Sequence, residues 1–219
     1  MTSKKELKLF SNASAIFFDF DGVIKDSVEI KSNIFGELFK DFGVDLVQKV
    51  KKHNDNNGGI SRYEKIPMYM EWAGIAASNE VLNKYLEEFS TLTMKKVIDS
   101  EWIPGVLPYL KKNYNRQLFF ILTATPQEDI EIITSELKIK DFFICIIGSP
   151  TKKSEALQQL LNENSIRATS AVMIGDSYED YDAAKFNSVP FILKKNIQNK
   201  NLQKNYNLTM IEDFNDEQI

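Results

Sequence analysis

The sequence FFDFDGVIKDS, at residues 17–27, joins an apolar run to two closely spaced carboxylates. Residues 15–20 have the composition of a buried strand, and Asp19, Asp21 and Gly22 end that strand in a tight loop. A buried carboxylate is unfavourable unless it is paired or coordinated, so Asp19 and Asp21 are expected to bind something. The alternative is that both belong to a solvated loop after the strand.

Strands and helices alternate along the second half of the chain. Strands are predicted over residues 117–122, 142–147, 171–174 and 190–193, with a short last one over 208–211, and helices over residues 127–137, 154–164 and 179–186. This alternation indicates βαβ units and a parallel sheet, in which residues 16–20 form the first strand.

The segment between the first two strands has a different pattern. Apolar residues recur at helical spacing from residue 28 to about residue 96. The Asn- and Gly-rich residues 53–60 are expected to form an exposed loop between helices, with His53 at the surface. We therefore predict a core domain made of residues 1–27 and 97–219, and an inserted helical domain made of residues 28–96.

The composition excludes several classes of protein. A length of 219 residues, with 43% hydrophobic and 26% charged residues, is typical of a globular chain and unlike collagen-like, mucin-like or strongly disordered sequences. The net charge of -4 provides no basic field for nucleic acid, and the first apolar stretch is shorter than the about 20 residues that span a bilayer. The single cysteine, Cys145, is expected to be a buried, unreactive thiol in a cytoplasmic protein. We expect neither a nucleic-acid nor a membrane partner.

A second acidic strand end follows at Gly175 and Asp176, with Asp180 one helical turn further on. Two acidic strand ends in one parallel sheet can converge on a hard cation such as Mg2+. Asp180 is either a ligand of that cation or a helix-capping residue.

Along the chain, residues with hydroxyl and lysine side chains come between the two acidic strand ends. Thr123 ends a predicted strand, and Lys152 and Lys153 open a predicted helix, which are features that favour a phosphate. The alternatives are that Thr123 only ends its strand and that the two lysines form a solvated pair.

These four motifs, in this order, resemble those of the haloacid dehalogenase superfamily, in its branch of phosphoglycolate phosphatases and β-phosphoglucomutases with a helical cap. The resemblance implies an α/β fold with a Rossmann-like parallel sheet flanked by helices and an inserted α-helical cap domain. It implies that Asp19 is the nucleophile and that Asp21 is the general acid/base. Thr123 would bind the phosphoryl oxygens, and Lys153, or else Lys152, would be the lysine of the third motif.

The resemblance also implies Mg2+ as the cofactor. Its expected ligands are Asp19, the main-chain carbonyl of Asp21, and Asp176. Gly22 and Ala124, beside the motif residues, are expected to bind substrate. Arg62 is expected to do so from the inserted segment, because it follows the Gly58-Gly59 turn and can reach over the active site.

The implied function is that of a Mg2+-dependent phosphatase acting on a small phosphorylated metabolite, of the sugar-phosphate or phosphoglycolate type, through an aspartyl phosphate. The alternatives are a β-phosphoglucomutase-like sugar-phosphate mutase and a non-enzymatic phosphoacceptor of the receiver type. Tyr178 and Glu179 stand where such mutases usually carry small residues, which favours hydrolysis, and receivers lack a long helical insertion. We expect a monomer or a homodimer.

Overall fold

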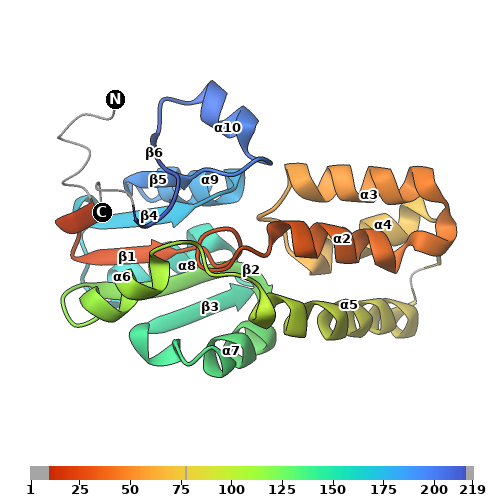
Figure 1. Ribbon diagram of the computed structural model, residues 1–219, viewed down its shortest axis with the longest axis horizontal. Coiled ribbons are helices and arrows are strands. Elements are labelled where there is room, and N and C mark those ends of the chain that lie inside the picture. The colour runs from red at the N-terminus through yellow and green to blue at the C-terminus, as the bar shows by residue number, and fades with distance from the viewer. Residues whose placement is uncertain (1–9, 77, 216–219) are drawn as a thin grey trace.

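The computed structural model describes residues 10–76 and 78–215, which form a parallel sheet flanked by helices (Figure 1). The described sheet has six strands in the order β3-β2-β1-β4-β5-β6, and each neighbouring pair is parallel. The strands are β1 (Ala15–Phe18), β2 (Leu118–Pro126), β3 (Cys145–Ser149), β4 (Ala171–Gly175), β5 (Phe191–Lys194) and β6 (Thr209–Ile211). The predicted α/β fold with a Rossmann-like parallel sheet is confirmed.

Helices bury both faces of the sheet. Successive residues of a strand point to opposite faces, so Phe18 packs in one apolar cluster and Phe17 in another. The first cluster includes residues of α6 (Val106–Asn113) and α7 (Gln127–Glu136), and the second includes residues of α8 (Lys153–Glu163) and α9 (Tyr178–Phe186). A short helix, α10 (Lys200–Asn205), lies between β5 and β6. Burial on both faces explains why the strands are almost continuously apolar.

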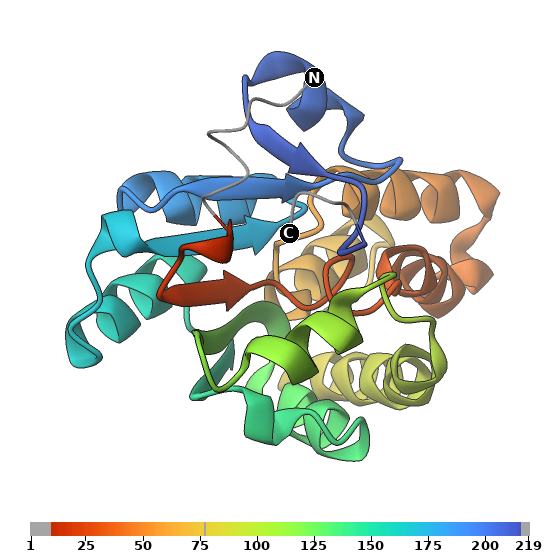
Figure 2. The same ribbon diagram turned by 60° about the vertical axis from the view of Figure 1, so that its left-hand side comes forward.

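A run of helices is inserted between β1 and β2, as predicted. It contains α2 (Val28–Leu38), η1 (Lys40–Phe42), α3 (Val44–Asn56), α4 (Arg62–Trp72) and α5 (Asn79–Asp99). We call residues 28–99 the helical insertion. It lies beyond the carboxyl ends of the strands (Figures 1 and 2) and has its own apolar cluster around Phe35, Tyr69 and Phe89. Because α5 continues past Lys96, the helix ends later than predicted, and the division into two domains stays a prediction.

The loop predicted over residues 53–60 is shorter than expected. Helix α3 continues through His53 to Asn56, and Asn54 is only 4% exposed. Asn54 Oδ1 accepts a hydrogen bond of 2.8 Å from Lys65 Nζ, so a tertiary contact outweighs the low helix propensity of asparagine. His53 is half-buried instead of fully exposed, because its Nδ1 lies 2.9 Å from the Tyr69 hydroxyl and its ring packs against Trp72.

Two further local predictions differ from the structure. The strand predicted from residue 142 begins only at Cys145, because residues 140–142 form a turn of 3-10 helix, η2 (Lys140–Phe142). Cys145 is therefore half-buried at the edge of an apolar cluster instead of fully buried. The described helices include none that is both long enough and apolar enough to cross a membrane.

The two chain segments that connect the sheet to the helical insertion are tied together by Lys25. Its side chain is 1% exposed, and its Nζ donates a 3.0 Å hydrogen bond to the carbonyl of Ile98 and another to the carbonyl of Ser100. The ammonium also lies 4.5 Å from the centre of the Trp102 ring. The lysine thus satisfies carbonyl groups at the end of α5, where the helix leaves them without helical partners.

Replacing Lys25 with Met is expected to lower the free energy of unfolding by about 1–3 kcal/mol, because two partly buried carbonyl groups lose their donor. Urea unfolding followed by circular dichroism measures this change. Lys52→Met, at an exposed position of α3, is the matched control and should leave stability unchanged. Equal unfolding midpoints for the two variants would contradict the role given to Lys25.

Candidate active site

A cavity lies between the carboxyl ends of the strands and the helical insertion. Residues that follow β1 and β4, including Asp19 and Asp176, line it from the sheet, and Arg62 and Lys65 of α4 line it from the insertion. The strand order places β1 directly beside β4 and β2, so three of the predicted motifs meet at one edge. This arrangement agrees with the rule that ligands bind at the carboxyl ends of parallel strands.

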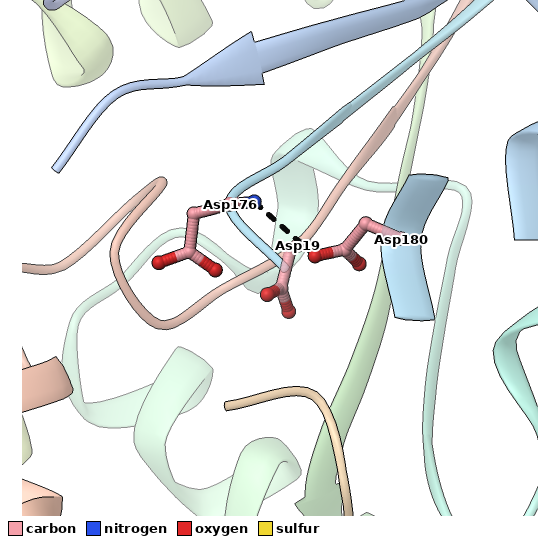
Figure 3. A group of neighbouring side chains, drawn as sticks. All are labelled: Asp19, Asp176 and Asp180. Carbon is pink, nitrogen blue, oxygen red and sulfur yellow. Dashed lines mark hydrogen bonds between the residues drawn. The ribbon is translucent and has the colours of Figure 1, made fainter. Parts of the chain in front are cut away.

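Three carboxylates converge at the edge of this cavity, which Asp19 and Asp176 line (Figure 3). One oxygen each of Asp19, Asp176 and Asp180 can be chosen so that all three atoms lie within 4.8 Å of one another. Asp19 follows β1, Asp176 follows β4, and Asp180 lies in the first turn of α9. Their exposed fractions are 5%, 9% and 0%, so water screens their mutual repulsion very little.

Burial and repulsion shift the proton equilibria of this cluster. Burial, followed by the negative charge of Asp180, raises the pKa of Asp19 to about 7, although Lys153 opposes the shift. Burial and the charge of Asp19 likewise raise the pKa of Asp176. The negative charge is therefore under-compensated by the side chains alone. A set of converging carboxylate oxygens fits the preference of Mg2+ for hard oxygen ligands.

Lys153 is the lysine that the structure brings to the cluster. Its Nζ lies 3.0 Å from Asp19 Oδ1 and 2.6 Å from Asp180 Oδ1, and its side chain is buried. Burial alone would lower the pKa of Lys153, but the charges of Asp180 and Asp19 outweigh it and raise the pKa. Lys152 is exposed at the N-cap of α8. The helix therefore points Lys153, and not Lys152, toward the carboxylates.

Asp180 holds the loop that carries Asp176. Its Oδ2 accepts hydrogen bonds from the backbone N–H groups of Asp176 (3.2 Å) and Ser177 (3.0 Å) and from the Ser177 hydroxyl (2.6 Å). Ser177 Oγ in turn accepts from the Asp180 N–H, which completes a capping box at the start of α9. Lys153 contacts the other oxygen, Oδ1, so both carboxylate oxygens of Asp180 already have partners. These contacts favour a helix-capping and positioning role for Asp180 over a role as a metal ligand.

Asp21 is surrounded by donors that the sequence did not single out. Ser27 Oγ donates to Asp21 Oδ1 (2.6 Å), while Lys31 Nζ and Thr125 Oγ1 (3.0 Å) donate to Asp21 Oδ2. Burial would raise the pKa of Asp21, but the Lys31 charge and these hydrogen bonds lower it overall. Lys31 belongs to α2 of the insertion, where nothing in the sequence separates it from other surface lysines.

Thr123 and Ala124 are brought into the cavity, whereas Gly22 lies next to Asp176 and outside the cavity lining. Thr123 Oγ1 accepts a 3.1 Å hydrogen bond from the N–H of Thr125. Gly22 has a φ of +77°, and a Cβ there would lie 2.2 Å from Asp176 Oδ2. Gly22 is therefore needed for the close approach of the β1 loop to Asp176.

Two asparagines form a second group that the sequence analysis missed. Asn196 Nδ2 donates to Asp176 Oδ2 (2.6 Å), and Asn199 Nδ2 donates to the main-chain carbonyl of Asp176 (2.9 Å). Both follow β5, the neighbour of β4 in the sheet. Their position after a predicted strand of the same parallel sheet is the signal that could have identified them.

Arg62 lines the cavity, but its guanidinium is already paired. It donates through Nη1 to Asp129 Oδ2 of α7, and the Ser90 hydroxyl donates to the same carboxylate at 2.9 Å. Its Nε is buried and has no hydrogen-bond partner among the described residues. Substrate binding by Arg62 stays a prediction, and the contact seen is a bridge between the insertion and α7.

The comparisons with known proteins agree with this geometry. Residues 16–194 match the family model described as haloacid dehalogenase-like hydrolase. No curated protein matches the sequence significantly.

Several solved structures share the fold. A β-phosphoglucomutase from Clostridium difficile has a TM-score of 0.73 and 22% identity, over 93% of this chain and 92% of that one. A predicted phosphoglycolate phosphatase from Haemophilus somnus has a TM-score of 0.70 and 15% identity, over 93% and 95% of the two chains. CbbY from Rhodobacter sphaeroides, solved with xylulose-(1,5)bisphosphate, has a TM-score of 0.73 and 16% identity, over 93% and 96%. At these identities the likeness shows the fold alone.

Replacing Asp19 with Asn is expected to stabilise the metal-free protein at pH 8. The folded-state pKa of Asp19 is about 7 and its ordinary value is 3.8, so the folded state loses stability as pH rises between these values. We expect Tm in EDTA to rise by roughly 3–6 °C at pH 8, which is roughly 1–2 kcal/mol for a chain of this size, and by less at pH 5.

Differential scanning calorimetry at the two pH values measures this difference. Asp26→Asn, at an exposed position of the same loop, is the control and should leave Tm unchanged at both. A lower Tm for Asp19→Asn at pH 8, or an equal change at both pH values, would contradict the electrostatic account of the cluster.

Proposed function

The chain belongs to the haloacid dehalogenase-like hydrolase family, and from this premise we propose that it is a Mg2+-dependent phosphatase. Its proposed substrate is a small phosphorylated metabolite of the sugar-phosphate or phosphoglycolate type, and the proposed intermediate is an aspartyl phosphate on Asp19. The observation that carries the proposal is the contact between Asp19 and Lys153, at 3.0 Å, inside the cavity that Asp21 and Asp176 also line.

In the first proposed step, a carboxylate oxygen of Asp19 attacks the phosphorus of the substrate. The bond between phosphorus and the leaving oxygen breaks, and Asp21 gives a proton to that oxygen. Lys153 lies beside Asp19, so its positive charge offsets the negative charge of the transferring phosphoryl group. The Thr123 hydroxyl, on the next strand, would bind a phosphoryl oxygen, and its place in the cavity lining supports this role.

In the second proposed step, the Asp21 carboxylate takes a proton from a water molecule. The water oxygen attacks phosphorus, the bond to Asp19 breaks, and inorganic phosphate leaves. The contact with Lys31 favours the carboxylate form of Asp21, which suits this step. In the first step, substrate entry has to weaken that contact so that Asp21 can carry a proton.

We propose that Asp19, the main-chain carbonyl of Asp21, and Asp176 would hold Mg2+, with Asn196 orienting the Asp176 carboxylate. When bound, the ion supplies positive charge that offsets repulsion between the carboxylates and the phosphoryl group. Asp180 and Lys153 would keep the loop and the nucleophile in position. We also propose that the protein acts in the cytoplasm, as a monomer or a homodimer.

A mutase has to keep the phosphoryl group and return it to a second position of the sugar. The side chains of Tyr178 and Glu179, at the start of α9, favour hydrolysis, because mutases of this branch usually carry small residues there. A receiver-type phosphoacceptor is disfavoured by the helical insertion, which closes over the Asp19 site.

Asp19→Asn is expected to lower kcat for p-nitrophenyl phosphate by at least roughly a thousandfold, because no other carboxylate replaces the nucleophile. EDTA should abolish wild-type activity and added Mg2+ should restore it. Asp26→Asn serves as the matched control and should retain full activity. Activity of Asp19→Asn at the wild-type rate, or activity unaffected by EDTA, would show that the mechanism is wrong.

Hydrolysis is expected to release phosphate in equal amount to the sugar formed, without a bisphosphate activator. Incubation with glucose 1-phosphate, followed by separate assays for phosphate and for glucose 6-phosphate, distinguishes the two candidate functions. Accumulation of glucose 6-phosphate without release of phosphate would support the mutase alternative instead.

A further inference from the structure

Lys65 is a buried cation that the proposed chemistry does not use. It lies on α4, is 2% exposed, and lines the same cavity as Asp19 and Asp21. Lysine is seldom buried this completely without a partner of opposite charge. Its place on the wall opposite the strand ends puts it where the part of the substrate remote from the phosphoryl group would lie.

The described contacts of Lys65 are with neutral groups. Its Nζ donates to Asn54 Oδ1 at 2.8 Å and lies 5.5 Å from the centre of the Phe35 ring. No carboxylate oxygen of the described residues lies within 4.0 Å of this Nζ. An ammonium group has three donors, and a single hydrogen bond to an amide leaves two of them for a ligand.

The other cations that line the cavity already have anionic partners. Lys153 contacts Asp19 and Asp180, Lys31 contacts Asp21, and Arg62 contacts Asp129. Among the described lysines and arginines that line this cavity, Lys65 is therefore the one without an anionic partner.

The charges around Lys65 also favour the binding of an anionic ligand. Burial, together with the charge of the nearby Lys31, lowers the pKa of Lys65 to about 7, although the charges of Glu179, Asp21 and Asp55 oppose this shift. An anionic ligand would stabilise the ammonium form and bind more tightly through it.

We infer that Lys65 recognises a second anionic group, a carboxylate or a phosphate, on the phosphorylated substrate. This inference rests on the proposed function, because it assigns the phosphoryl group to Asp19 and the second anion to Lys65. A buried charge is stabilised by a paired anion, and a substrate anion is the partner that the protein itself does not supply. Specificity for doubly anionic substrates would then come from α4 of the insertion.

Matched substrate pairs test the inference. Phosphoglycolate and ethyl phosphate differ in a carboxylate, and glucose 1,6-bisphosphate and glucose 6-phosphate differ in a second phosphate. For the wild type, KM should be lower for the doubly anionic member of at least one pair. In Lys65→Met and Lys65→Gln that KM should rise by about tenfold or more, with the KM of its singly anionic partner changed by less than about twofold.

Lys52→Met, outside the cavity in α3, is the control and should leave every KM unchanged. Two variants are used because Gln keeps a polar contact with Asn54 if Met disturbs the fold. An equal rise for both members of each pair, no rise in either variant, or a wild type without any preference for the second anion would overturn the inference.

The test also separates this inference from the proposed function. If the wild type hydrolyses none of the four compounds, the proposed function fails, and calorimetric titration with phosphoglycolate and with glucose 1,6-bisphosphate then tests Lys65 by itself. Binding that is about tenfold or more weaker in Lys65→Gln supports the inference. Equal binding by wild type and variant, or no binding to either, overturns it.

Discussion

Mutual repulsion among three buried carboxylates is the constraint on which the rest of the site depends. Asp19, Asp176 and Asp180 meet because β1 and β4 are neighbours in a parallel sheet, and Lys153 contacts Asp19 and Asp180. Burial and the negative charge of Asp180 raise the pKa of Asp19 to about 7, so the cluster carries more negative charge than Lys153 offsets. A site with this charge distribution is suited to hold a cation and, through that cation, a phosphoryl group.

The surrounding structure holds these charges in place. The capping box of Ser177 and Asp180 fixes the loop after β4, and Gly22 allows the loop after β1 to approach it. The helical insertion contributes from the other side, since Lys31 contacts Asp21 and Arg62 contacts Asp129. The sheet therefore positions the carboxylates, while the insertion covers them and contributes Lys31, Arg62 and Lys65 to the lining of the cavity.

Strand-end motifs were predictable from the sequence because parallel topology brings the carboxyl ends of strands together. Asp19 and Asp176 were found in this way. Lys31 and Lys65 were not, because a lysine that faces a cavity and a lysine that faces water have the same helical spacing. The contact of Lys65 with Asn54 also explains why α3 continues into a stretch whose composition predicts a loop. Side-chain orientation on helices depends on tertiary packing, which short-range patterns do not encode.

The central claim, that the carboxylate cluster is completed by a divalent cation, is tested most directly by calorimetric titration of the metal-free protein with Mg2+ at pH 7. Titration in two buffers of different ionisation enthalpy reports the protons released. Because the pKa of Asp19 is raised to about 7 and the pKa of Asp176 is raised as well, the account predicts that one ion binds per chain with partial release of protons, and that Asp19→Asn releases fewer protons than the wild type. Absence of Mg2+ binding, or binding with the same proton release in Asp19→Asn, would contradict it.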